Sequence, residues 1–283
     1  MLINNRTLRL HQLPLLVAGL AFASQGTAAG IDWVGSADYS LGVNGVVTGD
    51  VVTDFHSYDF GPGAALLSNT SGGTVLTPNV GDTIQGYAQS YVSGHLNLGG
   101  TGIASPQLNT TGTGAGYELT FRSDFMETVT SATAGAIGYT VDSGSWEIYL
   151  DGTPDYNFAA DTGFTNDTAI LSGTIVQGAG NATIFGGGLF GVSTIDLLVT
   201  SFDTAIFEPD TIQAGSSVFT LQLGLGAPIG ATSVQGNLAD AEAGDLILTA
   251  DGNLELKAVP IPAAVWLFGS GLLGLVGVAR RRS

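Results

Sequence analysis

The residues best suited to chemistry in this sequence are oxygen ligands gathered in one short, turn-rich segment. Asp151, Asp155, Asn157 and Asp161 follow one another there, and Asn166 and Asp167 extend the series. Calcium prefers about six to eight oxygen ligands in flexible geometry, and weak extracellular sites meet that need with few carboxylates. The spacing does not match an EF-hand loop, and Asp and Asn also favour turns because their side chains bond nearby backbone. We therefore expect either a calcium site here, with no other cofactor, or plain turn chemistry.

Other reactive constellations are sparse. His56 and His95 are the two histidines beyond the N-terminal segment, the chain has no cysteine, and HExxH spacing is absent, so neither zinc binding nor a catalytic pair is favoured. We expect both imidazoles on exposed strand faces. Glu118 and Glu147 could serve as the acid and base of a glycosidase if their carboxyl groups lay ~5 to 9.5 Å apart. Nothing in the sequence brings those two together.

A glycine-rich run, 186–191, satisfies the GxGxxG pattern. The apolar-polar segment that follows it, 193–201, reads as a strand, so the helix N-terminus that would bind phosphate is missing. No Gly-x-Ser-x-Gly motif occurs in the secreted part of the chain. We therefore predict a glycine turn and a protein that is not an enzyme.

The elements that must position these residues are strands. Residues alternate between apolar and polar in five segments, which are 117–122, 146–151, 170–176, 195–199 and 219–224. An Asp251–Gly252 pair between two such runs predicts a hairpin over 245–257. The glycine-rich stretch 94–116 predicts a long loop. These patterns predict an all-β fold, with an antiparallel β-sandwich or jelly-roll-like body as a single domain.

Charge narrows the choice of partner. All 24 carboxylates lie from Asp32 to Glu255, and residues 30–258 contain only Arg122 and Lys257 as cations, which gives a net charge of −22. Such a surface repels phosphate and anionic lipid, so nucleic acid is excluded as a main partner. Cations, neutral polymers and other proteins remain.

The N-terminal segment has the three parts of a secretory signal peptide. Arg6 and Arg9 precede an apolar run of 11 residues, 13–23, and small residues follow up to Ala29. The run is too short to span a bilayer of ~30 Å as a helix. We predict a signal peptide over 1–29, with export by the general secretion route because no Arg-Arg pair occurs there; a buried N-terminal helix is the alternative.

The C-terminal segment predicts a transmembrane helix over 263–279. These 17 uncharged residues would span about 26 Å as a helix, and three arginines follow them. Positive residues stay cytoplasmic, so we expect the C-terminus inside the inner membrane and the acidic body outside. A plain single-span anchor is one interpretation of this tail.

A Pro motif, an apolar helix and a terminal arginine cluster, in that order, resemble the PEP-CTERM sorting signal of Gram-negative bacteria. The residues that carry the resemblance are Val259, Pro260, Ile261, Pro262, Arg280, Arg281 and Arg282. Ile261 stands where that family usually has Glu. The resemblance implies that 259–283 is recognised by exosortase, an enzyme of the inner membrane, and that the body reaches the cell surface or the extracellular space. The stretch 144–174 also resembles a segment of flocculation-associated PEP-CTERM proteins.

These signals together lead to one main hypothesis for residues 30–258. We expect an exported, non-catalytic surface or matrix protein of a biofilm or floc, associated with exopolysaccharide or another cell-envelope polymer. The alternatives are a calcium-assisted carbohydrate-binding module and a secreted glycosidase. A groove lined by Trp146, Tyr149, Tyr156 and Phe158 would favour sugar binding, and two convergent carboxylates in a cleft would favour the enzyme.

Overall fold

A computed structural model describes residues 31–41, 49–111, 116–212, 216–224, 230–238 and 244–258. The predicted signal peptide and the sorting tail lie outside these residues. The described chain is almost entirely β-strand, with one 3₁₀ turn, η1 (Tyr39–Leu41). None of the helical structure in these ranges has the length and apolarity needed to cross a membrane.

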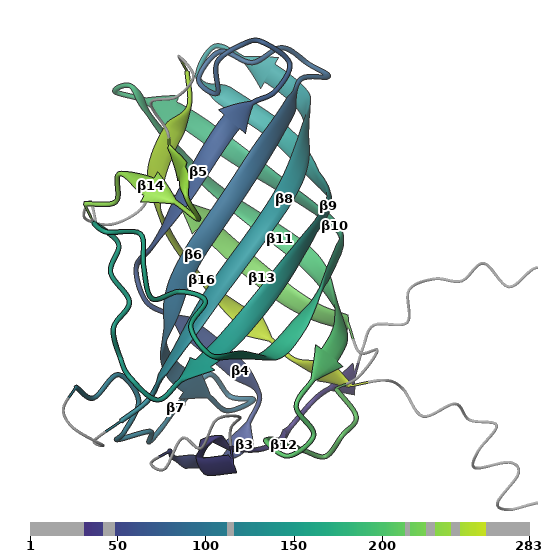
Figure 1. Cartoon of the computed structure of the whole chain (residues 1–283). Helices are drawn as coiled ribbons and strands as arrows, with labels where there is room; N and C mark the ends of the chain where they lie inside the picture. The colour runs from purple at the N-terminus through teal and green to yellow at the C-terminus, as the bar shows by residue number, and fades with distance from the viewer. Residues whose placement is uncertain are drawn as a thin grey trace, which may run out of the picture.

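Long antiparallel strands form the body, and they close into a barrel (Figure 1). The eight positions around it are filled, in order, by β6 (Thr83–Leu96), β8 (Glu118–Thr133), β9 (Ala136–Asp151), β10 (Thr168–Phe185), β11 (Gly188–Phe202), β13 (Ser216–Leu223), β16 (Leu246–Glu255) and β5 (Gly63–Asn69). Pairing of β13 with β16, and of β5 with both β16 and β6, seals the ring. The short strand β4 (Ser57–Phe60) continues the position of β5 beyond the break at Gly61–Pro62, since it also lies between β6 and β16.

The all-β antiparallel prediction is therefore confirmed, whereas the sandwich or jelly roll is wrong. A sandwich consists of two separate sheets, but here every long strand has hydrogen-bonded neighbours on both edges. The predicted hairpin over 245–257 is also wrong. β16 runs straight through Asp251 and Gly252 because β13 pairs with it there, with Gln222 opposite Asp251 and Leu221 opposite Gly252.

The predicted strands lie where strands are found, but the observed strands are longer than predicted. All five alternating segments lie on β8, β9, β10, β11 and β13, apart from Tyr117 and Gly224 at segment ends, but the first four strands have 15 to 18 residues each. Inward positions are buried apolar side chains such as Phe121, Trp146 and Ile148. An eight-stranded barrel is just wide enough for such side chains to fill it, so the core is the barrel interior.

Gly186 and Gly187 form the tight turn between β10 and β11. Both have positive φ, +61° and +81°, as a two-residue type I′ hairpin turn requires. The glycine turn predicted in place of a phosphate loop is confirmed. The predicted loop over 94–116 is confirmed only in part, because β6 extends to Leu96 and β7 (Gly102–Ile103) pairs with it.

Short elements close one end of the barrel. β2 (Gly35–Asp38) pairs with β3 (Val51–Phe55) and β12 (Phe207–Glu208), and β1 (Ile31–Asp32) pairs with β17 (Lys257–Ala258). Fully buried aromatic rings pack there, including an edge-on pair, Trp33 and Phe55, with ring centroids 5.7 Å apart. The ends of the described chain, Ile31 and Ala258, are thus neighbours (Figure 1).

Two segments lie against the outer face of the barrel. The loop that joins β9 to β10, residues 152–167, places Tyr156 flat on Tyr91 of β6, with ring centroids 4.5 Å apart. The hairpin of β14 (Ser233–Val234) and β15 (Asn237–Leu238) packs Val234 into a second apolar cluster with Ala64 and Leu66. This covering buries side chains that the alternation assigns to solvent.

One acidic side chain points into the barrel. Glu127 of β8 is 3% exposed and lines an apolar cavity of about 20 Å³ with neighbours that include Leu67, Val129 and Tyr139. Its Oε1 has no hydrogen-bond partner. Burial, with a smaller contribution from the charge of Asp142, raises the pKa of Glu127 to about 8. The cavity is large enough for one water molecule and too small for a substrate.

Candidate metal centre

Glu118 and Asp151 face each other because of the register between β8 and β9. Glu118 pairs directly with Asp151, so the two side chains are on the same face of the sheet. That face is the outer one, since Leu119 and Phe121 on the other face are core residues. Both acidic residues are nevertheless buried, Glu118 completely and Asp151 to 6% exposure, because the β9–β10 loop covers them.

The loop brings a third carboxylate. Asp155 follows a turn in which the amide of Thr153 donates to Asp151 Oδ1 at 2.7 Å. The amides of Asp155 and Tyr156 then donate to Glu118 Oε2 at 3.0 and 3.4 Å. One carboxylate oxygen from each of Glu118, Asp151 and Asp155 lies within 4.8 Å of the others. Among the described residues this trio has the spacing of a metal site, and all its ligands are oxygens.

Electrostatics at this cluster disfavour three ionised acids. Burial raises the pKa of Glu118 to about 8, against the two amide hydrogen bonds, and the charges of Asp151 and Asp155 add to the rise. The pKa of Asp151 is also raised, first by burial and then by the charges of Asp167 and Asp155. Asn166 donates Nδ2 to Asp155 Oδ1 at 3.0 Å, which supplies a neutral partner and no positive charge.

The predicted ligand set is only partly brought together. Asp151 and Asp155 belong to the cluster. Asn157 instead accepts the amide of Ala160 in a local turn. Asp161 points to the β14–β15 hairpin, where it accepts from Ser233 and the amide of Gly236, both at 2.7 Å, and it also accepts from Gln89 at 2.8 Å. These bonds lower the pKa of Asp161 in spite of its partial burial.

Glu118 is the residue that sequence reasoning missed as a ligand. A signal for it exists in the β8–β9 hairpin, whose turn at 134–135 places Thr133 opposite Ala136. Counting outward from this pair puts Glu118 opposite Asp151. The two register shifts on the way leave out Thr130 on one strand and Asp142 on the other, so they cancel.

The histidines are buried, contrary to expectation. His95 is completely buried; its Nε2 lies 2.9 Å from the hydroxyl of Tyr39 and its Nδ1 2.9 Å from Ser105 Oγ. Burial lowers the pKa of His95 to about 3, so the imidazole is neutral. His56 is 5% exposed and bonds the carbonyl oxygen of Trp33 through Nδ1. Both rings therefore help to pack and hydrogen-bond the closed end of the barrel.

The residues predicted for the two alternative activities do not come together in the described structure. Glu147 lies opposite Arg122, four cross-strand pairs on from the Glu118–Asp151 pair, or about 13 Å along the strand. Trp146 is inside the barrel at 1% exposure, and Tyr149 donates its hydroxyl to Glu147 Oε2 at 2.6 Å. Tyr156 and Phe158 belong to the β9–β10 loop and pack inward against the barrel. They do not line a groove with Trp146 and Tyr149.

The residues of the sorting signal, Val259 to Pro262 and Arg280 to Arg282, lie outside the described residues. Comparisons with known proteins add no assignment for the rest. No protein-family model matches the chain, and no curated protein or solved structure is significantly similar to it.

Proposed function

We propose that this chain is an exported, non-catalytic protein of the bacterial cell surface or extracellular matrix. Residues 1–29 direct secretion, residues 259–283 are the PEP-CTERM-type signal that exosortase reads, and residues 30–258 are the working body. The body associates with exopolysaccharide or another envelope polymer, as in a biofilm or floc.

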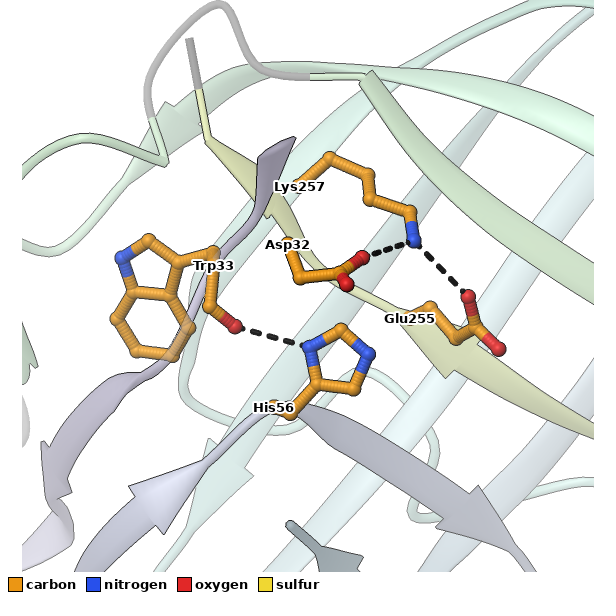
Figure 2. A network of polar contacts seen from close by, with 5 residues as sticks. All are labelled: Asp32, Trp33, His56, Glu255 and Lys257. Carbon is orange, nitrogen blue, oxygen red and sulfur yellow. Dashed lines mark hydrogen bonds and ion pairs between the residues drawn. The ribbon is translucent and has the colours of Figure 1, made fainter. Parts of the chain in front are cut away.

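The observation that carries the proposal is the pairing of β1 with β17. Ile31 lies opposite Ala258 and Asp32 opposite Lys257. Figure 2 shows Lys257 between two acids, with its Nζ 2.6 Å from Asp32 and 3.1 Å from Glu255. A leader before Ile31 and a tail after Ala258 therefore depart from one point, at one end of the barrel. This geometry suits a body held at the membrane by that end while its other surfaces face outward.

Charge and packing support the rest of the proposal. The net charge of −22 over residues 30–258 disfavours anionic partners and suits a neutral polymer or one bridged by cations. Buried side chains fill the described barrel interior, and cavities of about 20 and 10 Å³ between them have room for water alone. A closed, filled barrel provides an outer surface for contacts.

The test is to express the full chain in a Gram-negative host that has an exosortase, and in the same host without it. We expect the extracellular form to lack residues 263–283 by intact-mass measurement, and to be absent from the deletion strain. Changing Pro260 and Pro262 to Ala should retain the chain in the inner membrane, whereas the control Pro106→Ala, in the body, should be exported normally. An extracellular chain that still ends at Ser283 would refute the proposal.

A further inference from the structure

We propose that Glu118, Asp151 and Asp155 bind a calcium ion, which fastens the start of the β9–β10 loop to the outer face of the barrel. The site follows from the body alone and does not depend on how the chain is exported or processed.

The first argument is an unsatisfied oxygen in a buried position. Glu118 is completely buried; its Oε2 accepts the two loop amides, but Oε1 is buried with no hydrogen-bond partner. A buried polar atom without a partner destabilises the folded state, and more so where it is charged. The carboxylate of Glu118 lies within 4.8 Å of those of Asp151 and Asp155, so a cation among them would bind the carboxylate whose Oε1 has no partner.

The second argument is uncompensated charge. Like charges directly opposite on neighbouring strands destabilise a sheet, and Glu118 and Asp151 form such a pair when both are ionised. Asp155 joins them from the loop, and the charge of Asp167, the last residue of the same loop, also acts on Asp151. The two described cations are engaged elsewhere: Arg122 donates Nε to Gln235, and Lys257 binds Asp32 and Glu255.

The ligand set selects calcium over other common metals. It contains no histidine or cysteine, which disfavours zinc and copper. Three carboxylates can supply about three to six oxygens, and loop carbonyls or water can complete the shell of about six to eight that calcium accepts in irregular geometry. Magnesium demands a nearly octahedral shell and gives up its water reluctantly. Asp155 is exposed, so an ion and its water ligands have access from the loop side.

An ion at this place would complete the attachment of the loop. The later part of the loop is held by Asp161, which accepts hydrogen bonds from the β14–β15 hairpin and from Gln89 of β6. Tyr156 stacks on Tyr91 in between. The calcium site joins β8, the end of β9 and the first residues of the loop. It therefore restrains the segment 152–155, which the contacts of Tyr156 and Asp161 do not hold.

The experiment uses the full chain in detergent, stripped of cations and then titrated with CaCl₂ or with MgCl₂ at equal ionic strength. We expect one calcium ion per chain by calorimetry, with a dissociation constant of about 10⁻⁴ to 10⁻³ M, as in extracellular modules. Calcium at 100 times that constant should raise the melting temperature by about 5 to 10 °C, and magnesium by much less. Terbium should bind in the same place and luminesce by energy transfer from Tyr156.

Substitutions separate this site from general screening of acidic charge. Glu118→Gln and Asp155→Asn should each weaken calcium at least tenfold and abolish the terbium signal. Asp196→Asn removes the same charge from the outer face of β11 and should change neither. Asp155 is exposed, so its variant remains informative if Glu118→Gln does not fold. Equal shifts in the two salts, or calcium binding that survives Asp155→Asn, would overturn the proposal and leave protons as the neutralising partner of the cluster.

Discussion

Glu127 makes the stability of the folded barrel depend on pH between about 4.5 and 8, and its replacement by Gln should remove that dependence. The carboxyl group is buried in an apolar cavity, and its pKa is raised from an ordinary 4.5 to about 8. The folded state therefore keeps a proton that the unfolded chain releases above pH 4.5. The stability linked to this proton is complete below pH 4.5 and is lost as the pH rises toward 8.

The size of the effect follows from those two pKa values. Between pH 5 and pH 7 the group is protonated in the folded state and ionised in the unfolded state. Each pH unit in that window then costs the folded state about 1.4 kcal/mol, so two units cost about 3 kcal/mol. For a domain of this size, that is a fall of roughly 6 to 12 °C in melting temperature.

The assay is urea unfolding of the wild type and of Glu127→Gln at pH 5, 6 and 7. Glutamine cannot ionise, so the free energy of unfolding of the variant should gain on that of the wild type by about 3 kcal/mol across this range. Titration of Glu118 and Asp151 occurs in both proteins and cancels in the difference. Asp210→Asn, which removes an exposed carboxylate, should run parallel to the wild type. A constant difference between wild type and Glu127→Gln at all three pH values would refute the reasoning.

Two further predictions concern the core and its strands. His95 is held neutral, with its pKa lowered from 6.5 to about 3, so the stability that it contributes is present above pH 6.5 and declines as the pH falls. The difference in free energy of unfolding between wild type and His95→Asn should therefore shrink by about 2 kcal/mol from pH 6.5 to 5. A difference that stays constant over this range would contradict the prediction. Gly173→Ala should lose about 1–3 kcal/mol by thermal unfolding, because an added Cβ would meet the carbonyl oxygen of Leu198 on β11. Gly94→Ala, where a Cβ meets nothing within 4 Å, should be tolerated; equal losses would refute the packing argument.

The local sequence pattern predicted well where the strands lie. It did not predict contacts between segments that are distant in the sequence. Alternation predicted β8 and β9 because each presents one face to the core and one outward. The same alternation assigns Glu118 to solvent, and no local signal says that residues 152–167 fold back over it. Closure of the barrel could not be predicted from local pattern either, because the pairing of β13 with β16 joins residues that are more than 25 positions apart.

The errors in the candidate site have the same origin. Asp151 and Asp155 could be found because a turn joins them, whereas Asp161 is drawn away by a hairpin more than 70 residues later in the chain. His95 belongs to a polar-looking segment, but its ring is buried by Tyr39, which precedes it by 56 residues. Asp251–Gly252 has the residues of a turn, but pairing with β13 on one edge holds it extended instead. Long-range pairing outweighed local preference at each of these positions.

The closing strand β16 also determines how the body would bear a mechanical load. A pull on Ala258 acts along β16, which is bonded to β5 and β4 on one edge and to β13 on the other. A force parallel to a strand shears its ladder hydrogen bonds together instead of opening them one after another. The Lys257–Asp32 ion pair and the β1–β17 contact would yield first, as a small outer clasp. A force applied at Ala258 would therefore load the ladder bonds of β16 in shear, with β5, β4 and β13 sharing the strain.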